Sequence, residues 1–118
     1  MPTLRDTALS FSPDSPPLTV YFRHLTPDAA EIRAHGAVDA GSAGVLTTAL
    51  EHAIDAYPQV TCDLSGVTHF GAAGANAILA SHRRGAARGH RLLLAGVHGT
   101  AREVLLIAGL GTMLPVPG

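Results

Sequence analysis

The strongest constraint on the fold is an alternation of two hydrophobic patterns along the chain. Apolar residues recur at every second position in 18–23 and again in 31–38, which predicts two half-buried strands. The turn residues 26–28 between them make an antiparallel pair the natural arrangement. The apolar residues of 46–54 instead share one helical face, and Pro58 ends this helix. Strands followed by helices predict an α/β fold.

The same alternation continues after Pro58. A third strand is predicted over 60–64, followed by a turn over 65–70. The next helix is expected from about Gly74 to Arg88, because its apolar side chains fall on one face. Gly89 is well placed to end that helix in the left-handed conformation.

The last third of the chain predicts one more strand and one more helix. Residues 92–95 form a short continuous apolar run, typical of a buried parallel strand that is covered on both faces or lies centrally. Thr100 and Glu103 have the spacing of a capping box, so a helix should begin there. Gly109 should end it, and residues 113–116 are expected to form a short closing segment.

These elements predict a single-domain α/β fold. Ser42 or Asp39 can cap the first helix. Alternation after the first strand pair requires right-handed crossovers, and hence a mixed, mainly parallel sheet of about four or five strands packed with helices. The 118 residues suffice for one domain, which we assign to 18–118, and are too few for two. Residues 1–17 are rich in Pro and Ser and are expected to form a flexible N-terminal segment.

Charge and cysteine content argue against several classes of function. All 8 basic residues are Arg and face 9 acidic ones, so no basic excess exists to bind nucleic acid. The single cysteine, Cys62, excludes an internal disulfide, and its place on the inward side of a strand indicates an inert core thiol. The chain has no run of about 18 apolar residues, so we expect no membrane span. Residues 1–15 lack the uninterrupted apolar core of a signal peptide. We therefore expect a cytoplasmic protein.

We find no catalytic or metal-binding motif in the sequence. The 7 His are scattered, and no two are spaced as i and i+4. Only His69 deserves note, since it stands just before an unusual loop. No Gly-x-Ser-x-Gly sequence is present to anchor Ser/His/Asp catalysis. The sequence predicts a protein that is not an enzyme and that uses no metal or cofactor, and its high mean hydropathy indicates a partner surface.

The unusual loop is Gly71-Ala72-Ala73-Gly74, between a predicted strand and a predicted helix. A helix N-terminus presents free amides and a positive dipole end, so this loop could accept an anion. The Walker pattern is absent, because the chain has no Lys, and so is the dinucleotide pattern. A tight turn that needs small residues would explain the same four residues.

Several stretches of the chain resemble the STAS domain, the family of bacterial anti-sigma-factor antagonists. The resemblance covers roughly residues 18–116 and rests on Gly36–Asp39, Cys62–Val67, Phe70–Gly74, Ala80–Arg84 with Gly89, and Ala108–Leu110. It implies a STAS fold and a switch. In that family an unphosphorylated antagonist binds an anti-sigma factor, often a serine kinase, and so frees the sigma factor. Phosphorylation of a Ser in an Asp-Ser-Ser/Thr-Gly loop at a helix start breaks the complex.

The loop of this chain departs from the family pattern. Gly71 stands where the family has Asp, and Ala72 and Ala73 stand where it has hydroxyl residues. Ala72 occupies the phospho-acceptor position and has no oxygen to phosphorylate. The nearest hydroxyls, those of Thr68 and Ser81, lie outside the loop. The usual phosphorylation switch therefore cannot operate here.

The resemblance implies that the loop and the first turn after it bind the partner. The expected contact residues are Gly71, Ala72, Ala73, Gly74, Ala75, Asn76 and Asp39. The leading hypothesis is an antagonist-like regulator that binds an anti-sigma factor or switch kinase without loop phosphorylation. The alternative is a STAS scaffold or assembly subunit that associates with itself or with other proteins. A third hypothesis is binding of a nucleotide or other anion, which the absence of Lys weakens.

Overall fold

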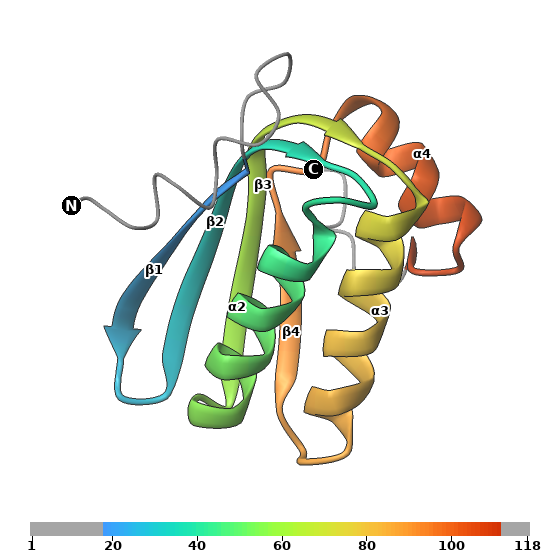
Figure 1. Ribbon diagram of the computed structural model, residues 1–118. Helices are drawn as coiled ribbons and strands as arrows, with labels where there is room; N and C mark the ends of the chain where they lie inside the picture. Colours follow the sequence, from blue (N-terminus) through green and yellow to red (C-terminus); the bar gives the residue numbers. More distant parts are fainter. Residues whose placement is uncertain (1–17, 112–118) are drawn as a thin grey trace, which may run out of the picture.

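Strands and helices alternate in the computed structural model, which describes residues 18–111 (Figure 1). The described elements, in chain order, are β1 (Thr19–Thr26), β2 (Ala29–Val38), α2 (Ala43–Ala56), β3 (Gln59–Phe70), α3 (Ala72–Ala86), β4 (Arg91–Ala95) and α4 (Gly99–Ile107). The order is the one that the sequence predicts, so the α/β assignment is confirmed. The predicted N-terminal segment 1–17 and closing segment 113–116 lie outside the described residues.

The strands form one mixed sheet in the order β1-β2-β3-β4. β1 and β2 are antiparallel, whereas β2 pairs parallel with β3, and β3 with β4. This confirms the mixed, mainly parallel sheet. Of the two placements predicted for 92–95, the central one is wrong, because β4 is an edge strand. The β1–β2 hairpin occupies one side of the parallel pair, and β4 pairs with the other side, along β3.

β3 is longer than predicted. The segment 65–70, expected to be a turn, continues the strand as far as Phe70 and pairs with the second half of β2. A bulge lies between the pairs Arg33/Asp63 and His35/Gly66, so small and turn-forming residues fall where the strand is irregular. A Cβ at Gly66 would lie 2.6 Å from Nδ1 of His35, which explains the glycine at this point.

α2 and α3 lie side by side on one face of the sheet (Figure 1). The core between these helices and the sheet contains Ile32, Leu46, Leu50, Ile54, Leu64 and Ile78, all 0–1% exposed. Gly85 of α3 has a packing function, because a Cβ there would lie 2.9 Å from Cγ1 of Ile54 in α2. Cys62 is fully buried, and burial raises the pKa of its thiol to about 12, which confirms the prediction of an inert core cysteine.

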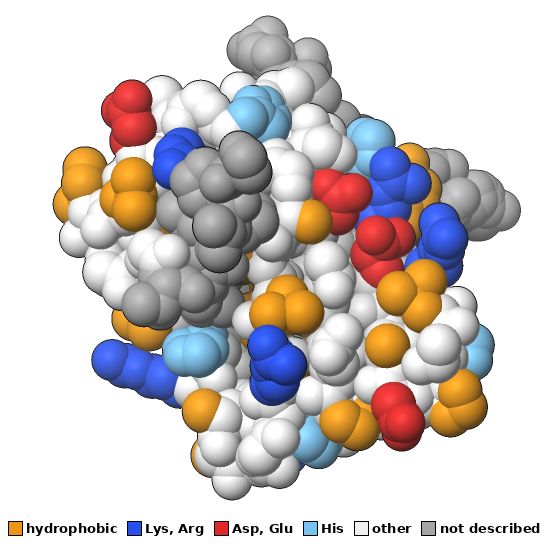
Figure 2. All heavy atoms as spheres, turned by 180° about the vertical axis from the view of Figure 1, so that it is seen from behind, with side chains coloured by type: hydrophobic (Ala, Val, Ile, Leu, Met, Phe, Trp, Pro, Cys, Tyr) orange, Lys and Arg blue, Asp and Glu red, His pale blue; other side chains and the backbone are white. Residues whose placement is uncertain are grey.

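The other face of the sheet carries ion pairs. Arg23 lies 4.0 Å from Glu31 across β1 and β2, and Arg33 lies 3.6 Å from Asp63 across β2 and β3. Figure 2 shows this side of the molecule, on which red and blue charged side chains lie among uncharged ones. In β2 and in the first half of β3, alternate residues therefore separate an apolar face under the helices from a polar face behind them.

The helix C-termini follow the sequence predictions. Gly89 and Gly109 both have positive φ, +74° and +83° respectively. After α4 the amide of Leu110 donates to the carbonyl of Leu105 at 2.9 Å, and that of Gly109 to Leu106 at 3.0 Å, which is a Schellman motif.

The helix N-termini differ from the predictions. Ser42 is the N-cap residue of α2, but its side chain makes no hydrogen bond to a helix amide. α4 begins after His98, so Thr100 lies within its first turn, and the predicted capping box does not form. α3 begins at Ala72, two residues earlier than predicted, with Gly71 as its N-cap.

Candidate functional site

The loop and the turn that contains Asp39 lie together at the C-terminal ends of β2 and β3. Val38 is the last residue of β2 and pairs with Phe70, the last residue of β3. The amide of Gly71 donates to the carbonyl of Val38 at 3.1 Å. Asp39 and Gly71 are 32 residues apart in the sequence, yet this hydrogen bond joins Gly71 itself to the residue just before Asp39.

Only part of the predicted contact set is exposed. Ala72 and Asn76 are exposed and lie one helical turn apart at the start of α3. Gly71 and Ala73 are half-buried, whereas Gly74, the last residue of the loop, and Ala75, which follows it, are buried. Of the predicted contact set, the exposed residues are therefore Ala72, Asn76 and Asp39.

The two glycines of the loop differ in function. A Cβ at Gly74 would lie 2.8 Å from the ring of Phe70, so close packing of α3 on the end of β3 requires glycine there. Gly71 has φ −103° and ψ −170°, which any residue adopts, and its nearest neighbour is Nε2 of His69 at 3.6 Å. Nothing at Gly71 therefore excludes a larger side chain.

Asp39 places a negative charge beside the loop. Its Oδ1 accepts hydrogen bonds from the amides of Gly41 and Ser42, both at 3.0 Å, and the Ser42 hydroxyl lies 3.1 Å away. The hydrogen bond from the Ser42 side chain lowers the pKa of the Asp39 carboxyl below its usual value of 3.8, and the nearby His69 acts in the same direction. Asp39 is exposed and ionised at neutral pH.

This geometry can be set against known proteins. A family model described as "Mlab, STAS domain" matches residues 22–115. The chain belongs to the STAS domain family. The resemblance found in the sequence is thereby confirmed, and the fold described above is the fold of a STAS domain.

Solved structures of anti-sigma factor antagonists share this STAS fold. SpoIIAA in its unphosphorylated form matches with a TM-score of 0.73 and 20% identity, over 82% of this chain and 86% of its own. SpoIIAA of Bacillus in the phosphorylated form gives 0.69 and 20%, over 82% and 89%. An antagonist from Mycobacterium paratuberculosis gives 0.71 and 22%, over 83% of each chain. A search of curated protein sequences finds no match.

The two hydroxyls nearest to the loop of this STAS domain differ in access. Thr68 is exposed near the end of β3. Ser81 is fully buried in α3, and its Oγ has no hydrogen-bond partner. A kinase could reach Thr68 in the folded domain but not Ser81.

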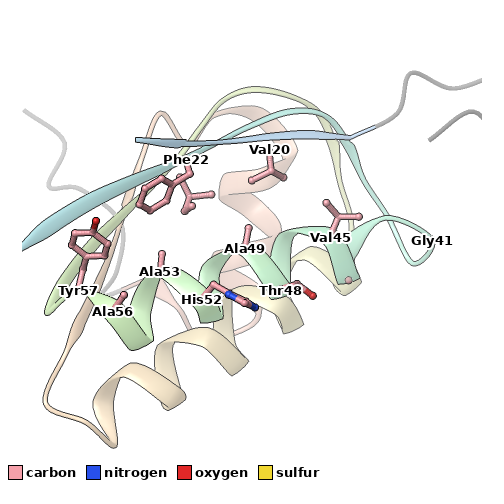
Figure 3. A pocket seen from close by; sticks show the side chains of 12 residues that line it. Val20, Phe22, Gly41, Val45, Thr48, Ala49, His52, Ala53, Ala56 and Tyr57 are labelled. Carbon is pink, nitrogen blue, oxygen red and sulfur yellow. The ribbon is translucent and has the colours of Figure 1, made fainter. Parts of the chain in front are cut away.

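The sequence analysis missed a groove on the side of α2 that faces away from α3. It has a volume of ≈ 1130 Å³ and lies between α2 and β1 (Figure 3). Val20 and Phe22 point from β1 toward Ala49 and Ala53 of α2, with His52 nearby on the helix (Figure 3). The sequence carries only part of the signal: Ala49 and Ala53 lie within the predicted apolar segment 46–54, but their position opposite β1 depends on the tertiary structure.

The described residues offer no metal site and no membrane helix. Within 18–111, no group of three or more His, Cys, Asp or Glu side chains could hold a metal ion. In the same part of the chain, no helix is long and apolar enough to cross a membrane.

Proposed function

We propose that this STAS domain is an antagonist-like regulator that binds an anti-sigma factor or a serine kinase of the switch type. Contact is made by Ala72 of the loop and by Asn76 in the first turn after it, together with the Asp39 turn beside the loop. The domain acts by protein contact, is not an enzyme, needs no cofactor and works in the cytoplasm. It has no affinity for nucleic acid.

The observation that carries this proposal is the junction of Asp39 and the loop at one end of the sheet. The hydrogen bond from Gly71 to Val38 fixes the start of α3 against the end of β2. A partner that covers Ala72 also lies within reach of the carboxylate of Asp39. A contact surface of small and uncharged side chains with one fixed charge at its border suits a specific protein interface.

Control by phosphorylation of the loop is absent in this proposal. Ala72 has no hydroxyl, so the domain behaves as a permanently unphosphorylated antagonist. A phosphate would add about −1.5 to −2 charges at this surface and would have to be desolvated on binding. Its absence leaves binding to be set by the amounts of the two partners.

The test is an affinity pull-down of the tagged full chain from lysate of the cells that produce it, with bound proteins identified by mass spectrometry. We expect recovery of an anti-sigma factor or a switch kinase. Ala72→Asp places a charge in the loop and should abolish that recovery. Ala80→Asp is the matched control, because Ala80 is also exposed on α3, two helical turns further along.

Two outcomes would contradict the proposal. Recovery that Ala72→Asp leaves unchanged would mean that the loop is not the contact. Recovery of only this chain or of other STAS proteins would favour the alternative function, a scaffold or assembly subunit. The exposed side chains of Tyr21 and Phe22 on β1 favour that alternative.

A further inference from the structure

β1 is an edge strand whose outer side is unpaired among the described residues. The sheet order places β2 on one side of β1 and no described strand on the other. Every second residue of an edge strand directs its N–H and C=O outward, which makes the strand a template for a further strand. Three large apolar side chains of β1 are exposed: Tyr21 by 52%, Phe22 by 55% and Leu25 by 43%.

The usual devices that block strand addition are missing along most of β1. Lys is absent from the whole chain, and no Pro occurs between Thr19 and Thr26. Arg23 is the one residue of β1 that is charged at neutral pH irrespective of its surroundings. The irregularity in pairing between His24 and Thr26 lies at the far end of the strand, so residues 19–24 remain regular and able to pair.

The groove described above lies under this same strand. α2 covers the apolar face of the sheet beside β1 but leaves Phe22 exposed by 55% and Val20 only partly buried on the wall of the groove (Figure 3). Val45 of α2, on the far wall of the groove, is also exposed, by 43%. An added strand would extend the sheet and bring its own side chains over the groove.

We propose that the occupant is a second copy of this chain, with β1 paired antiparallel to β1 of the other copy and Phe22 on the two-fold axis. In this register the two Phe22 rings meet on the groove side of the sheet. On the polar side, Tyr21 of each copy lies opposite Arg23 of the other, an arrangement that permits a cation–π contact.

The neighbouring strands support this register. In each copy β2 places Glu31 beside Arg23 and Arg33 beside Tyr21. On the polar side of the dimer, side chains from the four strands then line up in two symmetric rows. Each row consists of Glu31 and Arg23 from one copy, followed by Tyr21 and Arg33 from the other copy. No two like charges lie directly opposite. A register centred on Arg23 would oppose two guanidinium groups, and one centred on Tyr21 would place Arg23 opposite Thr19.

This inference goes beyond the proposed function and does not depend on it. The loop at the end of β3 lies at the C-terminal ends of the parallel strands, whereas the dimer uses the free edge of β1. Both loops of the dimer therefore stay open to a partner.

The test is sedimentation equilibrium of the full chain over a wide concentration range. We expect a reversible monomer–dimer equilibrium. Phe22→Arg places two guanidinium groups on the axis and should raise the dissociation constant by at least about tenfold. Leu106→Arg is the matched control, because Leu106 is exposed by 48% on α4, and it should leave the dimer intact. A wild-type chain that stays monomeric throughout, or a dimer that Phe22→Arg does not weaken, overturns the proposal.

If Phe22→Arg fails to fold, disulfide cross-linking tests the dimer instead. Phe22→Cys should give a disulfide-linked dimer under mild oxidation, because the two introduced thiols meet on the axis. The native Cys62 is fully buried and contributes no background. Leu106→Cys is the matched control and should remain unlinked. Equal linkage of the two variants would indicate random collision and would count against the dimer.

Discussion

The amide of Gly71 donates a hydrogen bond to the carbonyl of Val38, 3.1 Å away, and so joins the first residue after β3 to the last residue of β2. This bond satisfies a free amide at the start of α3 without using a side chain. It also places the Asp39 turn against the loop. The predictions below test the packing, the capping and the charges around this junction.

Gly74→Ala should destabilise the domain by about 1–3 kcal/mol, because the added Cβ would lie 2.8 Å from the ring of Phe70. Gly44→Ala is the control. Gly44 lies in the first turn of α2 with no atom within 4 Å of an added Cβ, so this change should stabilise by up to about 1 kcal/mol. Urea denaturation measures both. Equal effects of the same sign would mean that Gly74 is not kept by contact with Phe70.

Gly71→Asp should stabilise the domain by about 0.5 kcal/mol. Gly71 is the N-cap of α3, no side chain caps this helix, and an Asp there can accept a helix amide and complement the dipole. Gly71→Asn offers the same hydrogen bond without the charge. Thermal denaturation at low and high salt separates the two terms, since only the contribution of the charge is screened. A lower melting temperature for both variants would show that the loop needs glycine.

Ser81→Ala should raise the free energy of unfolding by about 1 kcal/mol. The Ser81 hydroxyl is fully buried without a hydrogen-bond partner, and Ala removes that group and favours the helix. Ser81→Cys keeps most of the volume without a strong donor and should fall between the two. Denaturant titrations of the three proteins provide the comparison. A destabilised Ser81→Ala would reveal a partner for the hydroxyl.

The ion pair between α2 and α3 should make stability depend on pH. Arg84 donates to both oxygens of Asp55 at 2.8 Å, and this hydrogen bonding holds the pKa of the Asp55 carboxyl below its usual value of 3.8. A lowered folded-state pKa adds stability above the unfolded value, and this stability is lost as the pH falls through the folded value. Asp55→Asn should therefore be less stable than wild type at neutral pH, and the difference should shrink below pH 3.8.

Arg84→Gln tests whether the ion pair with Arg84 causes this pH dependence of stability. Because both residues are exposed, the effect should be small and reduced by salt. Arg88 also lies 3.4 Å from Asp55, so Arg84→Gln should remove only part of the effect of Asp55→Asn. Once Asp55→Asn is present, adding Arg84→Gln should change little. If Asp55→Asn keeps the same deficit at every pH, then the pair with Arg84 is not its source.

The candidate site was predictable only in part. The sequence pointed to Gly71–Asn76 and to Asp39 through a resemblance, and the structure brings these two segments together. Exposure then divides the set, because helix α3 turns Gly74 and Ala75 toward the core and leaves Ala72 and Asn76 outside. Whether these residues bind a partner remains a prediction. The groove along β1 was not predicted, since it depends on where α2 crosses the sheet.

The sequence by itself determined the order of the elements, the apolar face of each one and the absence of a hydroxyl at Ala72. These features depend on residues within a few positions of one another, where periodicity and residue type are decisive. Only the tertiary structure decided that β3 continues to Phe70, that β4 lies at an edge, that Ser81 is buried and that Asp39 adjoins Gly71. Each of these depends on pairing or packing with a segment distant in the chain, and a strand ends where its neighbour stops supplying hydrogen bonds.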